Sequence, residues 1–240
     1  MSDVTNQSRL SRLDLDWRFH LGDIDAPLPN THVAAYMANK AGYARGAAKP
    51  NYDDSDWRMV ELPHDWSVEG RFDPSNHMDA GFLPRGIGWY RRRVRLDVSD
   101  RGKYLAIRFD GVASHCIVYV NGHLLHRNFC GYTPFTIDIS DIATFGDDLN
   151  VIALRVDATP MEGWWYEGAG IYRHTWLVKA SKLHVACDWT MGPMWQPLTP
   201  RMLLGSSSSR GFRSVDQALK PDLVNLPADS AAIVVPSPEL

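Results

Sequence analysis

The chain has 240 residues, of which 45% are hydrophobic and 22% charged, so it is long enough for one sizeable core or two small ones. Its 25 basic and 28 acidic side chains give a net charge of −3, which disfavours nucleic acid or an anionic membrane as a partner. No apolar run approaches the roughly 18–20 residues that span a bilayer. The 3 cysteines are scattered, which disfavours a disulfide framework or a zinc site.

The first residues of the chain are polar and contain no apolar export segment, which predicts a cytoplasmic protein with a flexible N-terminus over residues 1–12. Residues 32–48 are rich in Ala but include Gly42 and Gly46, so we expect either a surface insertion or a short helix there. From residue 13 to residue 186, short runs rich in Val, Ile, Tyr, Phe and Trp alternate with clusters of Gly, Pro, Asn and Asp. This alternation is typical of β-strands joined by turns.

Several runs in this region predict strands: 89–96, 104–109, 116–120, 123–126, 136–139, 149–156 and 171–178. The first of them alternates bulky and charged side chains toward its end, which predicts one solvent-facing side. Asn121-Gly122 predicts a type I′ hairpin turn, because both central residues of that turn need positive φ. Since no amphipathic helices separate the runs, they predict an all-β protein, a β-sandwich of jelly-roll topology.

The composition changes after Ala186. Residues 187–240 have no hydrophobic period, contain the run Ser206-Ser207-Ser208-Ser209 and end in a stretch rich in Pro and Ala. Such a segment buries too little apolar area to offset the entropy lost on ordering. We therefore predict a folded domain over residues 13–186 and a disordered tail over residues 187–240.

The most unusual local segment is the aromatic loop, which we define as residues 162–173. Trp164, Trp165 and Tyr166 stand between Glu162 and Glu167 and are followed by Gly168 and Gly170. Aromatic faces beside carboxylates suit a sugar, whose C–H faces lie on rings and whose hydroxyls donate to carboxylates. Trp164, Trp165, Tyr166 and Glu167 are therefore candidate substrate-binding residues. In the alternative interpretation the two tryptophans fill the open end of the sandwich and Glu167 forms a salt bridge.

Other motifs favour structural roles. Glu162 and Glu167 lie on one Gly-rich loop, and nothing fixes the separation that a glycosidase carboxylate pair requires. His123 and His126 fit a strand pairing better than a metal site. The cluster Asp53-Asp54-Ser55-Asp56 resembles part of a calcium loop but lacks its Gly and distal Glu, which favours a polar turn. No nucleophile motif or phosphate-binding glycine loop is visible, so we expect no catalytic residue, no cofactor and no metal in this chain.

Six blocks, taken together and in order, resemble the N-terminal domain of glycoside hydrolase family two over about three-quarters of the chain. They are 16–23 (DWRFHLGD), 54–66 (DSDWRMVELPHDW), 81–92 (GFLPRGIGWYRR), 109–122 (FDGV through VNG), 131–135 (GYTPF) and 165–173 (WYEGAGIYR). The bacterial β-galactosidase-like branch is the most similar. The resemblance implies a jelly-roll, galactose-binding-like sugar-binding domain that precedes an immunoglobulin-like sandwich and a (β/α)₈ barrel.

In that family the barrel supplies both catalytic glutamates, and neither has a counterpart here. The resemblance therefore implies that a β-galactoside-like carbohydrate is the partner of the full-length enzyme and that this chain alone is inactive. A stand-alone carbohydrate-binding module and a structural domain without independent activity are the alternatives.

In the family, the second domain usually starts with a strand that resembles Asp-Trp-Gly-Thr-Tyr-Val. Asp188-Trp189 matches the first two residues of this strand, but the residues that follow do not fit it. If the codons for residues 193–197 are read one nucleotide earlier, suitable third bases give the sequence Tyr-Val-Ala-Thr-Pro, which suits the first strand of that second domain. We therefore expect that a frameshift near Cys187 truncates the family sequence, with residues 187–240 out of frame. The alternative is a genuine short protein with a disordered tail, and the nucleotide sequence of the gene distinguishes the two.

Overall fold

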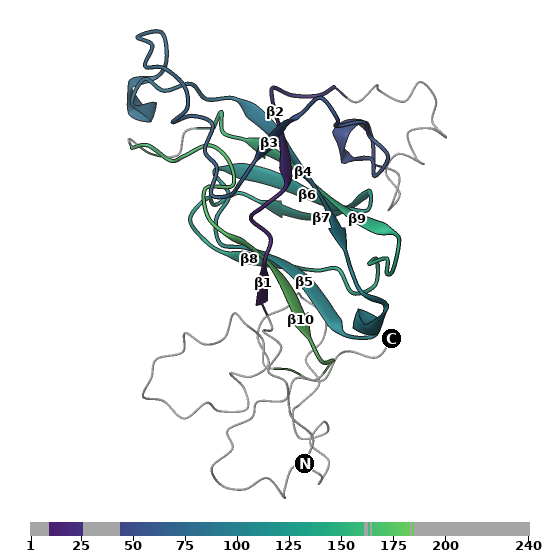
Figure 1. The fold of residues 1–240 in the computed structure, drawn as a ribbon. Helices are drawn as coiled ribbons and strands as arrows, with labels where there is room; N and C mark the ends of the chain where they lie inside the picture. Colours follow the sequence, from purple (N-terminus) through teal and green to yellow (C-terminus); the bar gives the residue numbers. More distant parts are fainter. Residues whose placement is uncertain (1–9, 26–43, 161–162, 164, 183, 185–240) are drawn as a thin grey trace, which may run out of the picture. The chain divides into compact units, whose positions relative to one another are not determined.

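The computed structural model describes residues 10–25, 44–160, 163, 165–182 and 184. In this part of the chain the strands form two antiparallel sheets that face each other as a β-sandwich, which confirms the predicted all-β class (Figure 1). The only helical pieces among the described residues are three short 3₁₀ turns, η1 (Gly46–Ala48), η2 (Met78–Ala80) and η3 (Val98–Asp100). Over the same residues, no helix is both long enough and apolar enough to cross a membrane.

The smaller sheet has four strands. In spatial order they are β1 (Leu10–Arg12), β10 (Thr175–Ala180), β5 (Tyr104–Phe109) and β8 (Phe135–Asp138). We expected residues 10–12 to belong to a flexible N-terminus, and this is corrected by their pairing with β10, in which Leu10 lies opposite Val178. The partner strand lies at the far end of the domain sequence, so no local pattern predicts the pairing.

The larger sheet has six strands. In spatial order they are β3 (Arg58–Val60), β2 (Trp17–Leu21), β4 (Ile87–Arg95), β9 (Leu149–Asp157), β6 (His115–Val120) and β7 (His123–Asn128). The long strands β4 and β9 form its centre. The predicted hairpin joins β6 and β7, and the φ angles of Asn121 (51°) and Gly122 (79°) confirm the expected turn conformation.

Apolar side chains from alternate strand positions fill the space between the sheets. Phe109 on β5, Val118 on β6 and Leu154 on β9 are fully buried. Along β6, buried residues alternate with half-buried ones, which is the two-residue period of a strand with one buried face. Burial of each such side chain contributes roughly 1.5–3 kcal/mol, so this core dominates the stability of the domain. It also provides the rigid base on which the loops at the sheet ends are held.

The outer face of the larger sheet is less exposed than the charged pattern of β4 predicts. Arg93 and Arg95 are exposed as expected, but Arg91 is fully buried beneath residues 44–57, which cross this face. Within residues 44–48 of that segment, where we expected an insertion or a short helix, Gly46–Ala48 form the single turn η1. The rest of the predicted segment, residues 32–43, lies outside the described residues, as does the predicted tail, residues 187–240.

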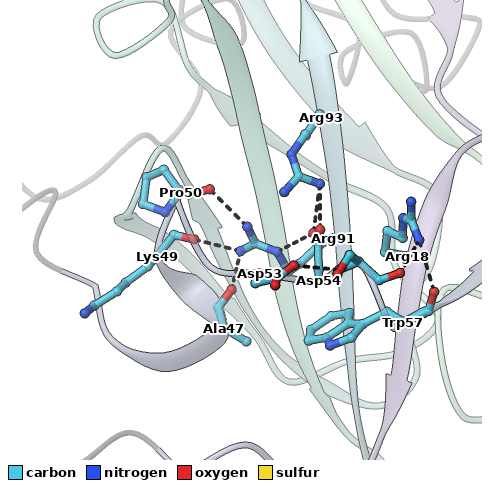
Figure 2. A network of polar contacts seen from close by, with 10 residues as sticks. Arg18, Ala47, Lys49, Pro50, Asp53, Asp54, Trp57, Arg91 and Arg93 are labelled. Atoms are coloured by element: carbon cyan, nitrogen blue, oxygen red, sulfur yellow. Dashed lines mark hydrogen bonds and ion pairs between the residues drawn. The ribbon is translucent and has the colours of Figure 1, made fainter.

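A polar network fixes this covering segment to β4 (Figure 2). Arg91 donates from Nε to Asp54 Oδ2 (2.8 Å), and its Nη atoms donate to the backbone carbonyls of Ala47, Lys49 and Pro50. Arg93 donates to both Asp54 carboxylate oxygens, at 2.8 and 3.0 Å. Burial opposes ionisation of Asp54, but the hydrogen bonds from the two arginines outweigh it and hold its pKa below the ordinary value. The acidic cluster at 53–56 is thus a turn whose buried carboxylate binds arginine.

Candidate functional site

The described part of the aromatic loop is anchored by backbone hydrogen bonds on two sides. Ala113 and Gly170 exchange two of them, at 2.9 and 2.8 Å. On the other side, the amide of Trp66 donates to Ala169 (3.0 Å) and the amide of His64 donates to Ile171 (2.8 Å). The loop therefore behaves as an irregular strand, which explains why β10 begins only at Thr175 and not at the predicted residue 171.

Gly170 allows this close packing. Its φ of 129° is unfavourable for any residue with a side chain, and a Cβ there would overlap with the Tyr90 hydroxyl and lie 2.6 Å from the His64 carbonyl oxygen. The His64 ring is itself buried, and its Nδ1 lies 2.6 Å from the Tyr90 hydroxyl. Burial lowers the pKa of His64, so the ring under the loop is neutral at neutral pH.

Trp165 lies on the surface of the domain. Its side chain is 58% exposed, and its indole Nε1 donates to the hydroxyl of Tyr132 at 2.8 Å. Tyr132 follows β7 and is 45% exposed. The Trp165 ring therefore does not fill the end of the sandwich, the role that the alternative interpretation gave to the two tryptophans. The other tryptophan, Trp164, lies outside the described residues.

Tyr166 connects the loop to a carboxylate. Its hydroxyl donates to Asp65 Oδ2 at 2.6 Å, and Asp65 Oδ1 accepts the amide of Ser67 at 2.9 Å. Burial and the neighbouring Asp65 carboxylate raise the pKa of Tyr166 well above its ordinary value, so the phenol stays protonated and keeps donating. A carboxylate has about four acceptor positions, and these two hydrogen bonds leave room for others.

Glu167 takes the ion-pair role. It is 6% exposed, and its Oε2 accepts a hydrogen bond from Arg85 Nη2 at 3.2 Å. Arg85 also donates to the carbonyls of Ala158 and Pro160, so it fastens the loop to the end of β9. Of the candidate residues, the structure thus places Trp165 and Tyr166 at the surface and Glu167 beneath it. Trp164 and Glu162 are not among the described residues.

Two residues of this surface were missed in the sequence. Asp65 and Tyr132 each lie inside a block that resembles the family, but nothing in either block points to the aromatic loop. The histidines of β7 fit a structural role: His126 stacks on Phe135 with ring centroids 4.8 Å apart. The described residues include no group of three or more His, Cys, Asp or Glu side chains able to hold a metal.

Comparison with known proteins agrees with this architecture. The family profile described as "Glycosyl hydrolases family 2, sugar binding domain" matches residues 10–181. The chain belongs to glycosyl hydrolase family 2. The match covers the sandwich and includes the aromatic loop, so the resemblance drawn from the six sequence blocks is confirmed.

Similar curated proteins carry two different names. A β-galactosidase of Bacteroides ovatus, BoGH2A, is 38% identical over 187 residues, which are 77% of this chain and 20% of that protein. A putative β-glucuronidase of Formosa agariphila is 36% identical over 140 residues, 57% of this chain and 13% of that protein. The family 2 chain described here therefore spans about a fifth or less of the length of these relatives.

Solved structures give the same result. A glycosyl hydrolase family 2 member from Bacteroides cellulosilyticus superposes with a TM-score of 0.61 at 34% identity, over 75% of this chain and 22% of that chain. A β-glycosidase from Bacteroides vulgatus gives a TM-score of 0.60 at 32% identity, over 74% of this chain and 21% of that chain. The match with this family 2 sandwich is again limited to a small part of each larger protein.

Proposed function

We propose that this family 2 domain serves a β-galactosidase-type glycoside hydrolase and that Trp165, Tyr166 and Asp65 form a surface for a β-galactoside. The observation that carries the proposal is the exposed Trp165 ring on the same anchored loop as a tyrosine that is hydrogen bonded to a carboxylate. The name of the 38% identical relative supports galactoside over glucuronide.

The chemistry of this surface suits a pyranose ring. The apolar C–H face of a galactoside packs on an aromatic ring such as that of Trp165. A hydroxyl at the ring edge donates to the free acceptor positions of Asp65, while the protonated Tyr166 holds that carboxylate in place. Because the loop is fixed by backbone hydrogen bonds to residues 64–66 and 113, little of its conformational freedom remains to be lost on binding.

Calorimetric or NMR titration of the chain with methyl β-galactopyranoside tests the proposal. We expect saturable binding with a Kd on the order of millimolar, which corresponds to about −4 kcal/mol. Trp165→Ala should weaken this binding at least about tenfold, because it removes the ring that covers the sugar face. Phe72→Ala is the matched control, since Phe72 is an aromatic residue of another loop and is 75% exposed. Equal binding by both variants would refute the role of Trp165.

A structural role is the second candidate, and the exposure of Trp165, Tyr166 and Tyr132 on one surface favours it. Exposed apolar surface of this kind commonly contacts another domain or another protein. In this case the chain should bind no sugar and should self-associate as its concentration rises. Sedimentation of the wild type and of Trp165→Ala, measured beside the titration, separates the two functions.

We also propose that the chain alone does not hydrolyse glycosides. A retaining or inverting mechanism needs two carboxyl groups on opposite sides of the scissile bond, roughly 5–9.5 Å apart. Glu167 is buried in its pair with Arg85 and is not available for this role. Turnover of an aryl β-galactoside by the purified chain, with contaminating enzyme excluded by a matched mock purification, would contradict this proposal.

A further inference from the structure

A surface hollow lies beside β2, and the exposed rings of the aromatic loop are not among the residues that line it. It has a volume of about 410 Å³, and residues of β2, of the start of β3 and the turn before it, and of the segments 66–70 and 84–85 line it. We call it the β2 hollow and define it by His20, Trp57, Arg58, Trp66, Glu69 and Arg85. A volume of a few hundred Å³ is typical of sites that enclose a small molecule.

The polar groups of the β2 hollow are already held in position. Arg58 Nη2 donates to Glu69 Oε2 at 2.6 Å and to His64 Nε2 at 2.8 Å. The side chains of Arg58 and Glu69 are 51% and 44% exposed, so a ligand can reach both partners of this ion pair. They present donors and an acceptor side by side, which is the pattern that two neighbouring sugar hydroxyls require.

The apolar part of the β2 hollow is aromatic. The His20 ring stacks on Trp57 with centroids 5.4 Å apart and planes at 30°, and Arg58 lies over the ring of Phe19. Trp66 is buried, and its indole Nε1 has no hydrogen-bond partner among the described residues. Buried N–H groups are normally paired, and the indole N–H of this lining residue is not.

The charges of the β2 hollow indicate which kind of sugar it takes. The two lining arginines are both paired, Arg58 with Glu69 and Arg85 with Glu167. Asp56 adds a further acidic side chain to the lining. Neither guanidinium is left to neutralise a bound carboxylate, so an anionic ligand gains nothing here. We propose that the β2 hollow is a second saccharide site of this domain and binds a neutral pyranose unit, with Arg58 and Glu69 on its hydroxyls.

NMR titration of the ¹⁵N-labelled full chain with methyl β-galactopyranoside, and separately with glucuronate, tests this proposal. We expect saturable shifts of the Gly70 amide and of the Trp57 indole with the neutral sugar and weaker effects with glucuronate. Glu69→Ala should weaken this binding at least about tenfold, and Glu69→Gln, which keeps the size of the side chain, should weaken it less. Asp147→Ala is the matched control, because it removes the acid of another exposed ion pair, with Arg95.

The result is independent of the site on the aromatic loop. Shifts at Gly70 that persist in Trp165→Ala and disappear in Glu69→Ala support the second site, whatever happens at the loop. The proposal is overturned if no shifts occur at Gly70 and Trp57, if Trp165→Ala removes them, or if glucuronate binds the β2 hollow more tightly. If the wild-type chain shows the shifts at Gly70 and Trp57 but none at the aromatic loop, the function proposed above is refuted and the second site stands.

Discussion

The buried carboxylate of Asp54 allows a quantitative test of how the outer face of the larger sheet is held. In Asp54→Asn the side chain keeps its size but loses the charge that faces Arg91, whose side chain is 0% exposed. Removal of one partner of a buried ion pair typically costs about 3–5 kcal/mol, because the other charge is left buried and uncompensated. Arg91 retains the carbonyls of Ala47, Lys49 and Pro50 as acceptors, so we expect a loss of about 3 kcal/mol, the lower end of that range.

Urea unfolding monitored by tryptophan fluorescence and circular dichroism measures this loss directly. For a domain of this size, about 3 kcal/mol corresponds to a decrease in Tm of roughly 6–12 °C. Asp147→Asn is the control, because Asp147 is fully exposed where it pairs with Arg95, and exposed ion pairs of this kind contribute little to stability. If Asp54→Asn costs no more than the control, the network does not hold the covering segment and our reasoning is refuted.

Three further experiments test the packing beneath the aromatic loop and the burial of the core. Burial lowers the pKa of His64 from 6.5, so the unfolded chain binds a proton on this ring more readily than the folded domain does. The stability that neutral His64 contributes should therefore be complete above about pH 6.5 and fall as the pH drops below it. In urea titrations His64→Gln should flatten this fall more than His126→Gln does, although burial also lowers the pKa of His126. Gly170→Ala should cost roughly 2–6 kcal/mol of unfolding free energy through overlap and backbone strain. Gly81→Ala, at a φ of 64° with open space around it, should cost only roughly 1–2 kcal/mol, and equal losses would contradict the packing described. Burial raises the pKa of Cys116 to about 12, so iodoacetamide at pH 8 should label this cysteine only in denaturant, as mass spectrometry would show. Rapid labelling of Cys116 itself in the native domain would contradict its burial.

Local patterns were sufficient to predict most strands. The apolar run of β9 and the Asn121-Gly122 turn are encoded by residues adjacent in sequence, so the sequence alone locates them. The burial of Arg91 follows instead from a segment that ends more than 30 residues earlier and folds over the sheet. An arginine followed by two more arginines looks solvent-facing until the chain segment that covers it is known.

The candidate site shows the same division. The composition of the aromatic loop predicts an unusual surface, and Trp165 and Tyr166 are exposed there. Their polar partners, Tyr132 and Asp65, are 33 and 101 residues away in sequence, and no spacing rule connects them. The residue type of Glu167 is compatible with a salt bridge, but only the folded chain shows that Arg85 is its partner.

The pairing of β1 with β10 has a consequence for how the domain is made. Leu10 finds its partner, Val178, only when nearly the whole domain has been synthesised. Until then β5 lacks its neighbour β10, and the smaller sheet has an open edge with unpaired backbone groups. Contacts between such distant residues make folding slow, because the chain between them must be ordered before the contact forms. The nascent domain therefore exposes an aggregation-prone edge on the ribosome until its last strand emerges, and binding of a chaperone during that interval would protect it.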